Sequence, residues 1–166
     1  MIIATRRTLL MPYNESLQSE FLMLNYCTKN RMLMDGSYTV SSAKRLFQRI
    51  LHDPSIYSLA VLDNQSRDYI GHVFIYNLDE RPTLGFLFDK AYWGRGIASE
   101  VLSAFLPQAL HHLHLYQVIA SVDSHHIASI RVLEKIGFEQ QSDLSSQKSA
   151  HRHYVFTSCE GELALE

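Results

Sequence analysis

The sequence predicts a single domain over residues 1–166 with an α/β (α+β) fold, in which helices cover both faces of a mixed, mostly antiparallel central sheet. Three observations lead to this prediction. The chain has 166 residues, 46% of them hydrophobic, which is enough to bury one core. No internal repeat, low-complexity tract or linker rich in Pro or Gly divides it. Its apolar pattern follows the order strand, two helices, three strands, helix, strand, helix, strand.

The first third of the chain is predicted to contain one strand and two helices. Residues 5–11 have a strand pattern, which Pro12 stops. Asn14 can cap a first helix over 15–28. Thr39 or Ser41 can cap a second helix, which ends before the Asp53-Pro54 pair.

The rest of the chain is predicted to complete the sheet and to add a second layer of helices. Strand patterns rich in β-branched and aromatic residues lie at 56–62, 69–78, 83–88, 115–122 and 153–158. Helical stripes run over 97–113 and over 127–136, where Gly137 stops the second. Pro107 inside the first stripe predicts a kink or an early end. A meander of strands followed by strand–helix–strand makes the sheet mixed.

Charge and cysteine content exclude several classes of partner. The net charge is −2, so no basic footprint for nucleic acid or for an anionic membrane is expected. No apolar run approaches the ~18 residues of a transmembrane helix, and no signal peptide is recognisable. Cys27 and Cys159 lack CxxC spacing, so reduced thiols are expected. We therefore expect a cytoplasmic protein.

Nine histidines raise the question of a metal site. His111 and His114 share a helical face, and two ligands at that spacing can hold zinc. A closed site needs four, however, and no cysteine is near. Histidines at the end of a helix are favoured by its dipole, so we expect them to be solvated and no metal to be bound.

The segment Tyr92-Trp93-Gly94-Arg95-Gly96-Ile97-Ala98-Ser99 joins a predicted strand to a predicted helix. Such a junction leaves backbone N–H groups unpaired at the positive end of the helix dipole, where a phosphate group can bind. The glycines allow close approach of the ligand, and Arg95 adds a positive charge. A tight turn that simply requires glycine is the alternative. The dinucleotide fingerprint and the P-loop both fit worse, because a third glycine and a Gly-Lys-Ser/Thr are absent.

A second segment lies one strand further on and ends Ala128-Ser129-Ile130-Arg131-Val132-Leu133-Glu134-Lys135-Ile136-Gly137-Phe138. Together with 92–100 it resembles the GNAT superfamily of N-acetyltransferases, and the RimJ/RimL-type branch in particular. The two motifs are separated by one helix and one strand, as that fold would place them. The detailed match covers about a third of the chain, and the strand order agrees over most of the rest.

The resemblance implies a binding mode for acetyl-CoA as cosubstrate. The pantetheine arm would pair with the strand 83–89, with Phe86, Leu87 and Phe88 facing it. The pyrophosphate would bind the amides of the cradle, which consists of Gly94, Arg95, Gly96, Ile97, Ala98 and Ser99. His126 and Ser129 would lie beside the thiol end. The Leu87 amide is then the expected oxyanion donor, and the Ser129 hydroxyl the expected partner of the departing thiolate.

Several residues depart from the family's pattern. His126 stands where Asn is usual, Thr83 where an acidic residue is common, and Leu133 where many relatives have Tyr. Met11 replaces the second Arg of the first-strand pattern. These changes leave the general base open among Asp79, Glu80 and a water chain.

We therefore expect acetyl transfer to a primary amine, either a peptide N-terminus or a small amine. One alternative is a non-catalytic CoA-binding module, and another is a nucleotide-binding α/β domain. The sequence carries no signal for the oligomeric state.

Overall fold

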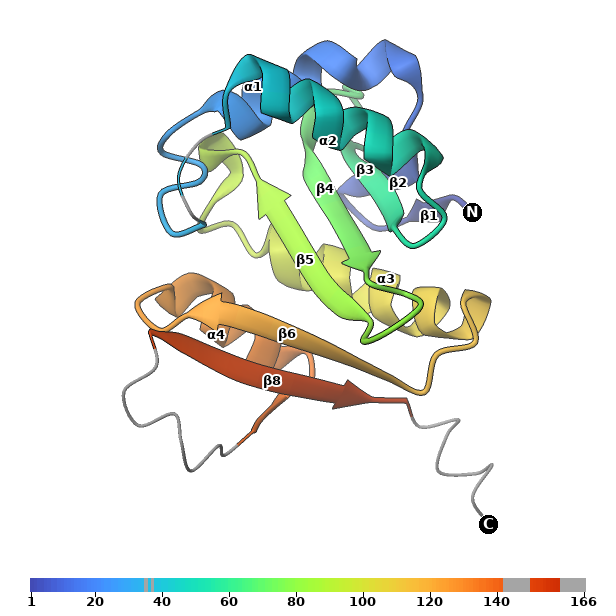
Figure 1. Cartoon of the computed structure of the whole chain (residues 1–166), viewed down its shortest axis with the longest axis vertical. Helices are drawn as coiled ribbons and strands as arrows, with labels where there is room; N and C mark the ends of the chain where they lie inside the picture. The colour runs from blue at the N-terminus through green and yellow to red at the C-terminus, as the bar shows by residue number, and fades with distance from the viewer. Residues whose placement is uncertain (35, 37, 142–149, 159–166) are drawn as a thin grey trace.

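The computed structural model describes residues 1–34, 36, 38–141 and 150–158, and within them eight strands form one sheet (Figure 1). The strands are β1 (Ile3–Ala4), β2 (Thr8–Pro12), β3 (Tyr57–Asp63), β4 (Tyr69–Tyr76), β5 (Thr83–Phe88), β6 (Gln117–Asp123), β7 (Glu139–Gln140) and β8 (His151–Thr157). Their order in the sheet is β1-β2-β3-β4-β5-β6-β8-β7. The β5–β6 pair is parallel, and the other neighbouring pairs in the described ranges are antiparallel.

Helices cover both faces of the sheet. They are η1 (Glu15–Leu17), α1 (Gln18–Tyr26), α2 (Val40–His52), η2 (Lys90–Tyr92), α3 (Ile97–His112) and α4 (Ile127–Lys135). In Figure 1, α1 and α2 lie in front of β2, β3 and β4, whereas α3 and α4 lie behind the sheet. The predicted α/β class, with a mostly antiparallel sheet between two helical layers, is confirmed.

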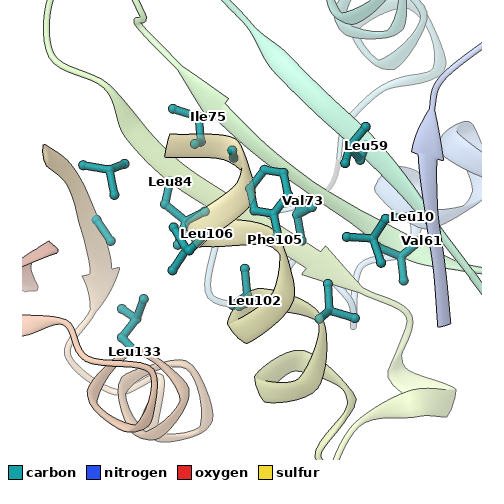
Figure 2. Close-up of a cluster of buried hydrophobic side chains, with 14 of the residues drawn as sticks. Leu10, Leu59, Val61, Val73, Ile75, Leu84, Leu102, Phe105, Leu106 and Leu133 are labelled. Atoms are coloured by element: carbon teal, nitrogen blue, oxygen red, sulfur yellow. The ribbon is translucent and has the colours of Figure 1, made fainter. Parts of the chain in front are cut away.

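The larger core lies between the sheet and α3. Leu102, Phe105 and Leu106 of α3 point toward the strands, where they meet Leu10, Leu59, Val61, Val73, Ile75 and Leu84 (Figure 2). These side chains are almost completely buried. Because apolar burial contributes roughly 25 cal/mol per Å², this layer is the main source of stability.

A second, aromatic layer lies under α1 and α2. The rings of Phe21 and Phe47 are 5.2 Å apart, and Tyr13 and His72 pack against Phe21 at 5.7 Å and 5.5 Å. His72 on β4 is 3% exposed. This face therefore contains a buried imidazole among aromatic rings.

The predicted order of elements is confirmed, with differences at some boundaries. The first strand begins at Thr8 rather than at 5, because Thr5–Arg7 form a turn in which the Thr5 N–H donates to the Thr8 carbonyl at 2.9 Å. The short strands β1 and β7 and the 3-10 turns η1 and η2 were not expected. Of the two predicted caps for α2, Thr39 is the one used, since its side chain accepts from the Ser42 N–H.

Of the two effects predicted for Pro107, a kink or an early end, the early end does not occur. The helix α3 continues past Pro107 to His112. Proline removes the hydrogen bond to the residue four positions earlier, which is Ser103. Both Pro107 and Ser103 are exposed, so water can satisfy the freed carbonyl.

Candidate active site

The strands β5 and β6 run parallel but separate soon after they begin. They share one register pair, Thr83 with Ile119, whose link is an Ile119 N–H to Pro82 carbonyl bond of 3.0 Å. By contrast, β4 pairs with β5 from Gly71–Phe88 to Tyr76–Thr83. Figure 1 shows the two strands diverging toward their C-terminal ends. The β5 edge beyond Thr83 is thus left without a partner strand, at the end of a parallel pair where α/β proteins bind ligands.

The unpaired edge of β5 presents the backbone of Phe86 and Phe88. In a strand, the N–H and C=O of successive residues point alternately to opposite edges. The Pro82 carbonyl points to β6, and the Asp89 N–H donates to Ile70 of β4 at 2.8 Å. Counted from either end of β5, the backbone N–H and C=O groups of the even-numbered residues point to β6, and those of the odd-numbered residues point to β4.

This alternation corrects one expectation. The Leu87 amide faces β4, so it is not free to act as the oxyanion donor. Consistent with this, a Cβ on Gly71 of β4 would lie 2.1 Å from the Leu87 carbonyl oxygen. Which residues of a strand face a given edge depends on its register with the neighbouring strand, and the sequence resemblance did not supply that register.

The loop after η2 forms the predicted cradle at the N-terminus of α3. Gly94 and Gly96 have φ values of 73° and 76°, a left-handed conformation that favours glycine. Gly96 is the N-cap and offers no side-chain bond, so the amides of Ile97, Ala98 and Ser99 lack acceptors within the helix. A Cβ at Gly94 would meet no atom within 4 Å. The cradle is therefore open and lined by N–H donors, as an anion requires.

A buttress behind the cradle was not foreseen from the sequence. Glu100 accepts from the Thr5 hydroxyl at 2.7 Å and from the Arg7 Nε at 3.0 Å. Arg7 Nη1 also donates to the Arg95 carbonyl at 2.9 Å. These contacts tie the β1–β2 turn to the first turn of α3. They join residues more than 85 positions apart in sequence, so no local pattern could reveal them.

Two side chains of the loop have defined partners. The indole Nε1 of Trp93 donates to the Phe88 carbonyl at 2.8 Å, at the open edge of β5. The Arg95 guanidinium lies 5.8 Å from the centre of the Tyr92 ring. Trp93 therefore marks the point where the edge of β5 meets the cradle.

A cavity of about 250 Å³ lies beside the cradle. Its lining comes from the β1–β2 turn, the β3–β4 turn and the loop after β5, namely Arg6, Arg7, Asp63, Asn64, Gln65, Ile70, Tyr92, Arg95 and Ile97. No lining residue belongs to β6 or α4, so this cavity is separate from the divergence of β5 and β6. We assign the candidate site to the divergence, where the free backbone groups are.

His126 and Ser129 come together at the start of α4, beyond the end of β6. The His126 Nδ1 accepts the Ser129 N–H at 3.2 Å and so caps the helix, while Nε2 lies 3.2 Å from the Ser129 Oγ. Both side chains are partly buried. Burial lowers the pKa of His126 below its ordinary value, so the ring is neutral at pH 7.

The face of β5 opposite α3 carries an aromatic feature that sequence analysis did not identify. A Cβ at Gly85 would lie 2.3 Å from the Phe74 ring, so that ring lies over Gly85. His72, Phe74 and Tyr76 follow one another on this side of β4, with ring centres 5.0 Å and 5.8 Å apart. In Figure 1, no helix of the described part of the chain lies in front of β5, β6 and β8, on the side away from α3.

The positions that depart from the family pattern offer no replacement acid at the same place. The Thr83 hydroxyl donates to the Arg81 carbonyl at 2.8 Å, and Leu133 is buried in the core at 1% exposure. Asp79 and Glu80 are exposed in the turn between β4 and β5.

Other expectations concern metals, membranes and thiols. In the described ranges, no group of three or more His, Cys, Asp or Glu is arranged to hold a metal ion. None of the helices described has the length and apolarity needed to cross a membrane. Cys27 has a free thiol that accepts from Lys90 Nζ at 3.3 Å, whereas Cys159 lies outside the described residues.

The chain is similar to known acetyltransferases. Residues 7–139 match the family model described as acetyltransferase (GNAT) domain. YjcK of Bacillus subtilis (strain 168), described as a probable N-acetyltransferase, is 28% identical over 114 residues, which cover 64% of this chain and 63% of that relative. YnaD of the same organism, an uncharacterized N-acetyltransferase, is 25% identical over 144 residues, covering 85% of this chain and 84% of that one.

Solved structures share the fold. An acetyltransferase from Agrobacterium tumefaciens str. C58 superposes with a TM-score of 0.81 at 19% identity, covering 95% of each chain. Spermidine N-acetyltransferase from Vibrio cholerae, in complex with CoA and spermine, gives a TM-score of 0.77 at 14% identity, covering 90% of this chain and 95% of that one.

Proposed function

The chain belongs to the GNAT acetyltransferase family, and from this premise we propose that it is an acetyl-CoA-dependent N-acetyltransferase, one domain over 1–166 that acetylates a primary amine. The observation that carries the proposal is the unpaired edge of β5 leading directly into the open cradle of Gly94–Ser99. The unpaired edge of β5 supplies backbone groups that can pair with an extended pantetheine arm, and the cradle supplies amides that can bind phosphates.

The residues that would hold acetyl-CoA follow from this arrangement. The amides of Gly94, Arg95, Gly96, Ile97, Ala98 and Ser99 would bind the pyrophosphate. The backbone of Phe86 and Phe88 would pair with the pantetheine arm. His126 and Ser129 would lie at its thiol end. Phe86 is nearer than Phe88 to the point where β5 and β6 meet, and so farther from the cradle. Its amide is therefore our candidate oxyanion donor in place of Leu87.

A neutral amine would attack the carbonyl carbon of the acetyl thioester and form the carbon–nitrogen bond, and the carbon–sulfur bond would break as the CoA thiolate departs. The proton that the nitrogen loses would pass to the general base, for which Asp79, Glu80 and a water chain are the candidates. The Phe86 N–H would stabilise the charge on the carbonyl oxygen, and the Ser129 hydroxyl would donate to the sulfur. The amine would approach over Phe74 and Tyr76. No side chain described here needs to form a covalent intermediate.

For the acceptor, we propose a peptide N-terminus or a small amine, in keeping with a RimJ/RimL-type chain. The motifs 92–100 and 128–138 support this branch. Among the structural neighbours, two structures are named as spermidine N-acetyltransferase from Vibrio cholerae. The open face beside Phe74 leaves room for either kind of amine.

A non-catalytic CoA-binding module is the second candidate. It is favoured by Thr83 and Leu133, since the first is bonded to a backbone carbonyl and the second is buried. Neither can act as the acid or base that relatives place there.

The test combines calorimetric titration with acetyl-CoA and a thiol-release assay. The panel contains spermidine, an aminoglycoside, phenethylamine and peptides that begin with Ser, Ala or Met. Binding together with thiol release on one acceptor supports the enzyme. Binding without release on any of them favours the module, and absence of binding contradicts both.

A further inference from the structure

We infer that His153 on β8 is the general base of the proposed reaction and accepts, through one water, the proton that the amine nitrogen loses. This inference rests on the proposed function and deepens it, because it names the base, which the sequence leaves open. Two observations support it. They are the register of the strands β5, β6 and β8, and the face of the sheet on which each side chain lies.

The amine has to reach the thioester from the face of the sheet that lies away from α3. On the other face, Leu84 of β5 and Ala120 of β6 are each 4% exposed and belong to the core beside α3. Because packed side chains fill that side, a polar amine would have to displace core residues to enter there. We therefore place the amine on the opposite face, where the Phe74 ring lies over Gly85.

The His153 side chain lies on this same face. Successive side chains of a strand point to opposite faces of the sheet. Tyr154 points toward the helices α3 and α4, because it is 0% exposed and its hydroxyl donates to Glu134 of α4 at 3.2 Å. Its neighbour His153 therefore points away from these helices, and it is exposed.

The register of the strands brings His153 level with the proposed oxyanion donor. Counted two residues along each strand from the pair that joins β5 to β6, Gly85 is level with Ser121. Ser121 in turn pairs with His153 of β8 (Figure 1). The Phe86 amide follows directly after Gly85, so His153 lies near the level at which the thioester oxygen would bind. The imidazole is one strand spacing, about 4.8 Å, beyond β6, and one water can bridge such a distance.

Other titratable groups near this face are less suited to accept the proton. Burial lowers the pKa of His72 to about 3, so that ring is too weak a base near neutral pH. The backbone N–H of His125 donates to the Asp123 carboxylate and lowers its pKa, which weakens it as a base. Asp79 and Glu80 precede β5, at the end where β5 and β6 are still paired.

The charges around His153 are compatible with a transient imidazolium. Among the described residues, the titratable groups that share its face on the neighbouring strands are Asp123 of β6, His151 of β8 and Glu139 of β7. Two carboxylates are therefore close to one other imidazole. His153 is exposed, so after the carbon–nitrogen bond has formed it can release the proton to solvent. His151, level with Leu87, is the nearest rival.

Substitution by glutamine at the two positions separates His153 from this rival. H153Q keeps a polar side chain but cannot accept a proton. With the best amine of the panel, kcat/KM should fall about a hundredfold, the lower end of what general bases contribute. Calorimetric affinity for acetyl-CoA and the melting temperature should match wild type. H151Q is the matched control and should keep kcat/KM within about threefold. A similar loss in both variants would overturn the inference.

The pH profile distinguishes a base from a residue that only shapes the site. Dividing the wild-type kcat/KM by that of H153Q cancels the ionisation of the amine itself. A base acts only when it is unprotonated, so this ratio should rise between about pH 5 and pH 8. Added imidazole should also raise the rate of H153A while leaving H151Q unchanged.

The same assay separates the base from the proposed function. If the wild type releases no thiol with any amine of the panel, the proposed function fails and the role of His153 fails with it. If the wild type is active but H153Q stays within threefold of it, or the ratio does not change with pH, the assignment of His153 alone is wrong.

Discussion

Single residues shape the proposed acceptor side of the site, and Gly85 is the clearest case. The Phe74 ring occupies the space that any side chain at position 85 would need, with contacts of 2.3 Å to an added Cβ. Gly85 thus leaves room for the Phe74 ring, and any side chain at position 85 would have to displace that ring. The ring that it admits forms the surface next to the unpaired edge of β5.

We predict that G85A displaces the Phe74 ring and weakens binding of the amine acceptor more than binding of acetyl-CoA. Overpacking of this kind costs about 1–3 kcal/mol of unfolding free energy. The KM for the amine should rise severalfold, while calorimetric affinity for acetyl-CoA stays within about twofold. F74L in the same background is the matched control, since a smaller side chain relieves the contact. A double variant whose losses simply add would contradict this explanation.

At the level of single residues, the sequence allowed a prediction where the structural reason lies within one short segment. The glycines of the cradle could be predicted, because a strand-to-helix junction with Gly94 and Gly96 needs no distant partner. The Leu87 assignment failed because the direction of a backbone amide depends on register with β4. Gly85 was missed for a similar reason, since its constraint comes from a ring on the neighbouring strand.

At the scale of elements, the loop between β5 and α3 joins the two halves of the proposed cofactor site. Trp93 is bonded to the edge of β5, and Arg95 projects from the cradle. Each of these side chains provides a separate test of where acetyl-CoA binds.

Trp93 is the one tryptophan in the chain, so its emission reports on this loop alone. Its indole N–H donates to the Phe88 carbonyl, and an arm pairing with β5 would share or displace that bond. We predict a saturable change in fluorescence on titration with CoA, with the same dissociation constant as calorimetry. W93F should abolish the signal and retain binding. Emission that is constant while heat is released would place the arm elsewhere.

Arg95 tests the charge of the cradle. R95E puts a negative charge beside the predicted phosphates, so acetyl-CoA binding should weaken about tenfold at low salt and less at high salt. R45E makes the same charge change on an exposed part of α2 and is the control. Equal affinity of R95E and R45E for acetyl-CoA would count against this placement of the phosphates.

The order of elements could be predicted because the spacing of apolar residues within one helix or strand does not depend on distant residues. That spacing differs between helices and strands, and caps such as Thr39 mark the boundaries. The divergence of β5 and β6 could not be predicted from periodicity. It is a property of how two strands pair, and the apolar pattern of either strand alone does not reveal it. The Glu100 buttress escaped prediction for the same reason, because it links the two ends of a long stretch of chain.

At the scale of the whole molecule, the two helical layers differ in their chemistry. The layer between the sheet and α3 consists mainly of aliphatic and aromatic side chains, and Figure 2 draws part of this cluster. The layer under α1 and α2 instead buries His72 among the rings of Tyr13, Phe21 and Phe74. Within the described residues its Nδ1 has no hydrogen-bond partner. A charged ring would be costly in this layer.

This buried imidazole should make global stability depend on pH. Burial, and to a lesser extent the charge of Arg31, lowers the pKa of His72 from 6.5 to about 3. Below pH 6.5 the unfolded chain therefore binds a proton that the folded chain does not. It follows that the unfolding free energy decreases as the pH falls from about 6.5 toward 3. At one pKa unit per 1.36 kcal/mol, the loss is about 2 kcal/mol by pH 5.

H72L should remove this contribution, because leucine cannot titrate and leaves no polar atom unpaired among the rings. We predict that the difference in unfolding free energy between pH 7.5 and pH 5, measured by urea denaturation, is about 2 kcal/mol smaller in H72L than in wild type. H52Q, at an exposed histidine, is the control and should keep the wild-type difference. If H72L and wild type lose the same free energy over this range, the acid sensitivity comes from other groups, and His72 is then protonated or hydrated in the folded state.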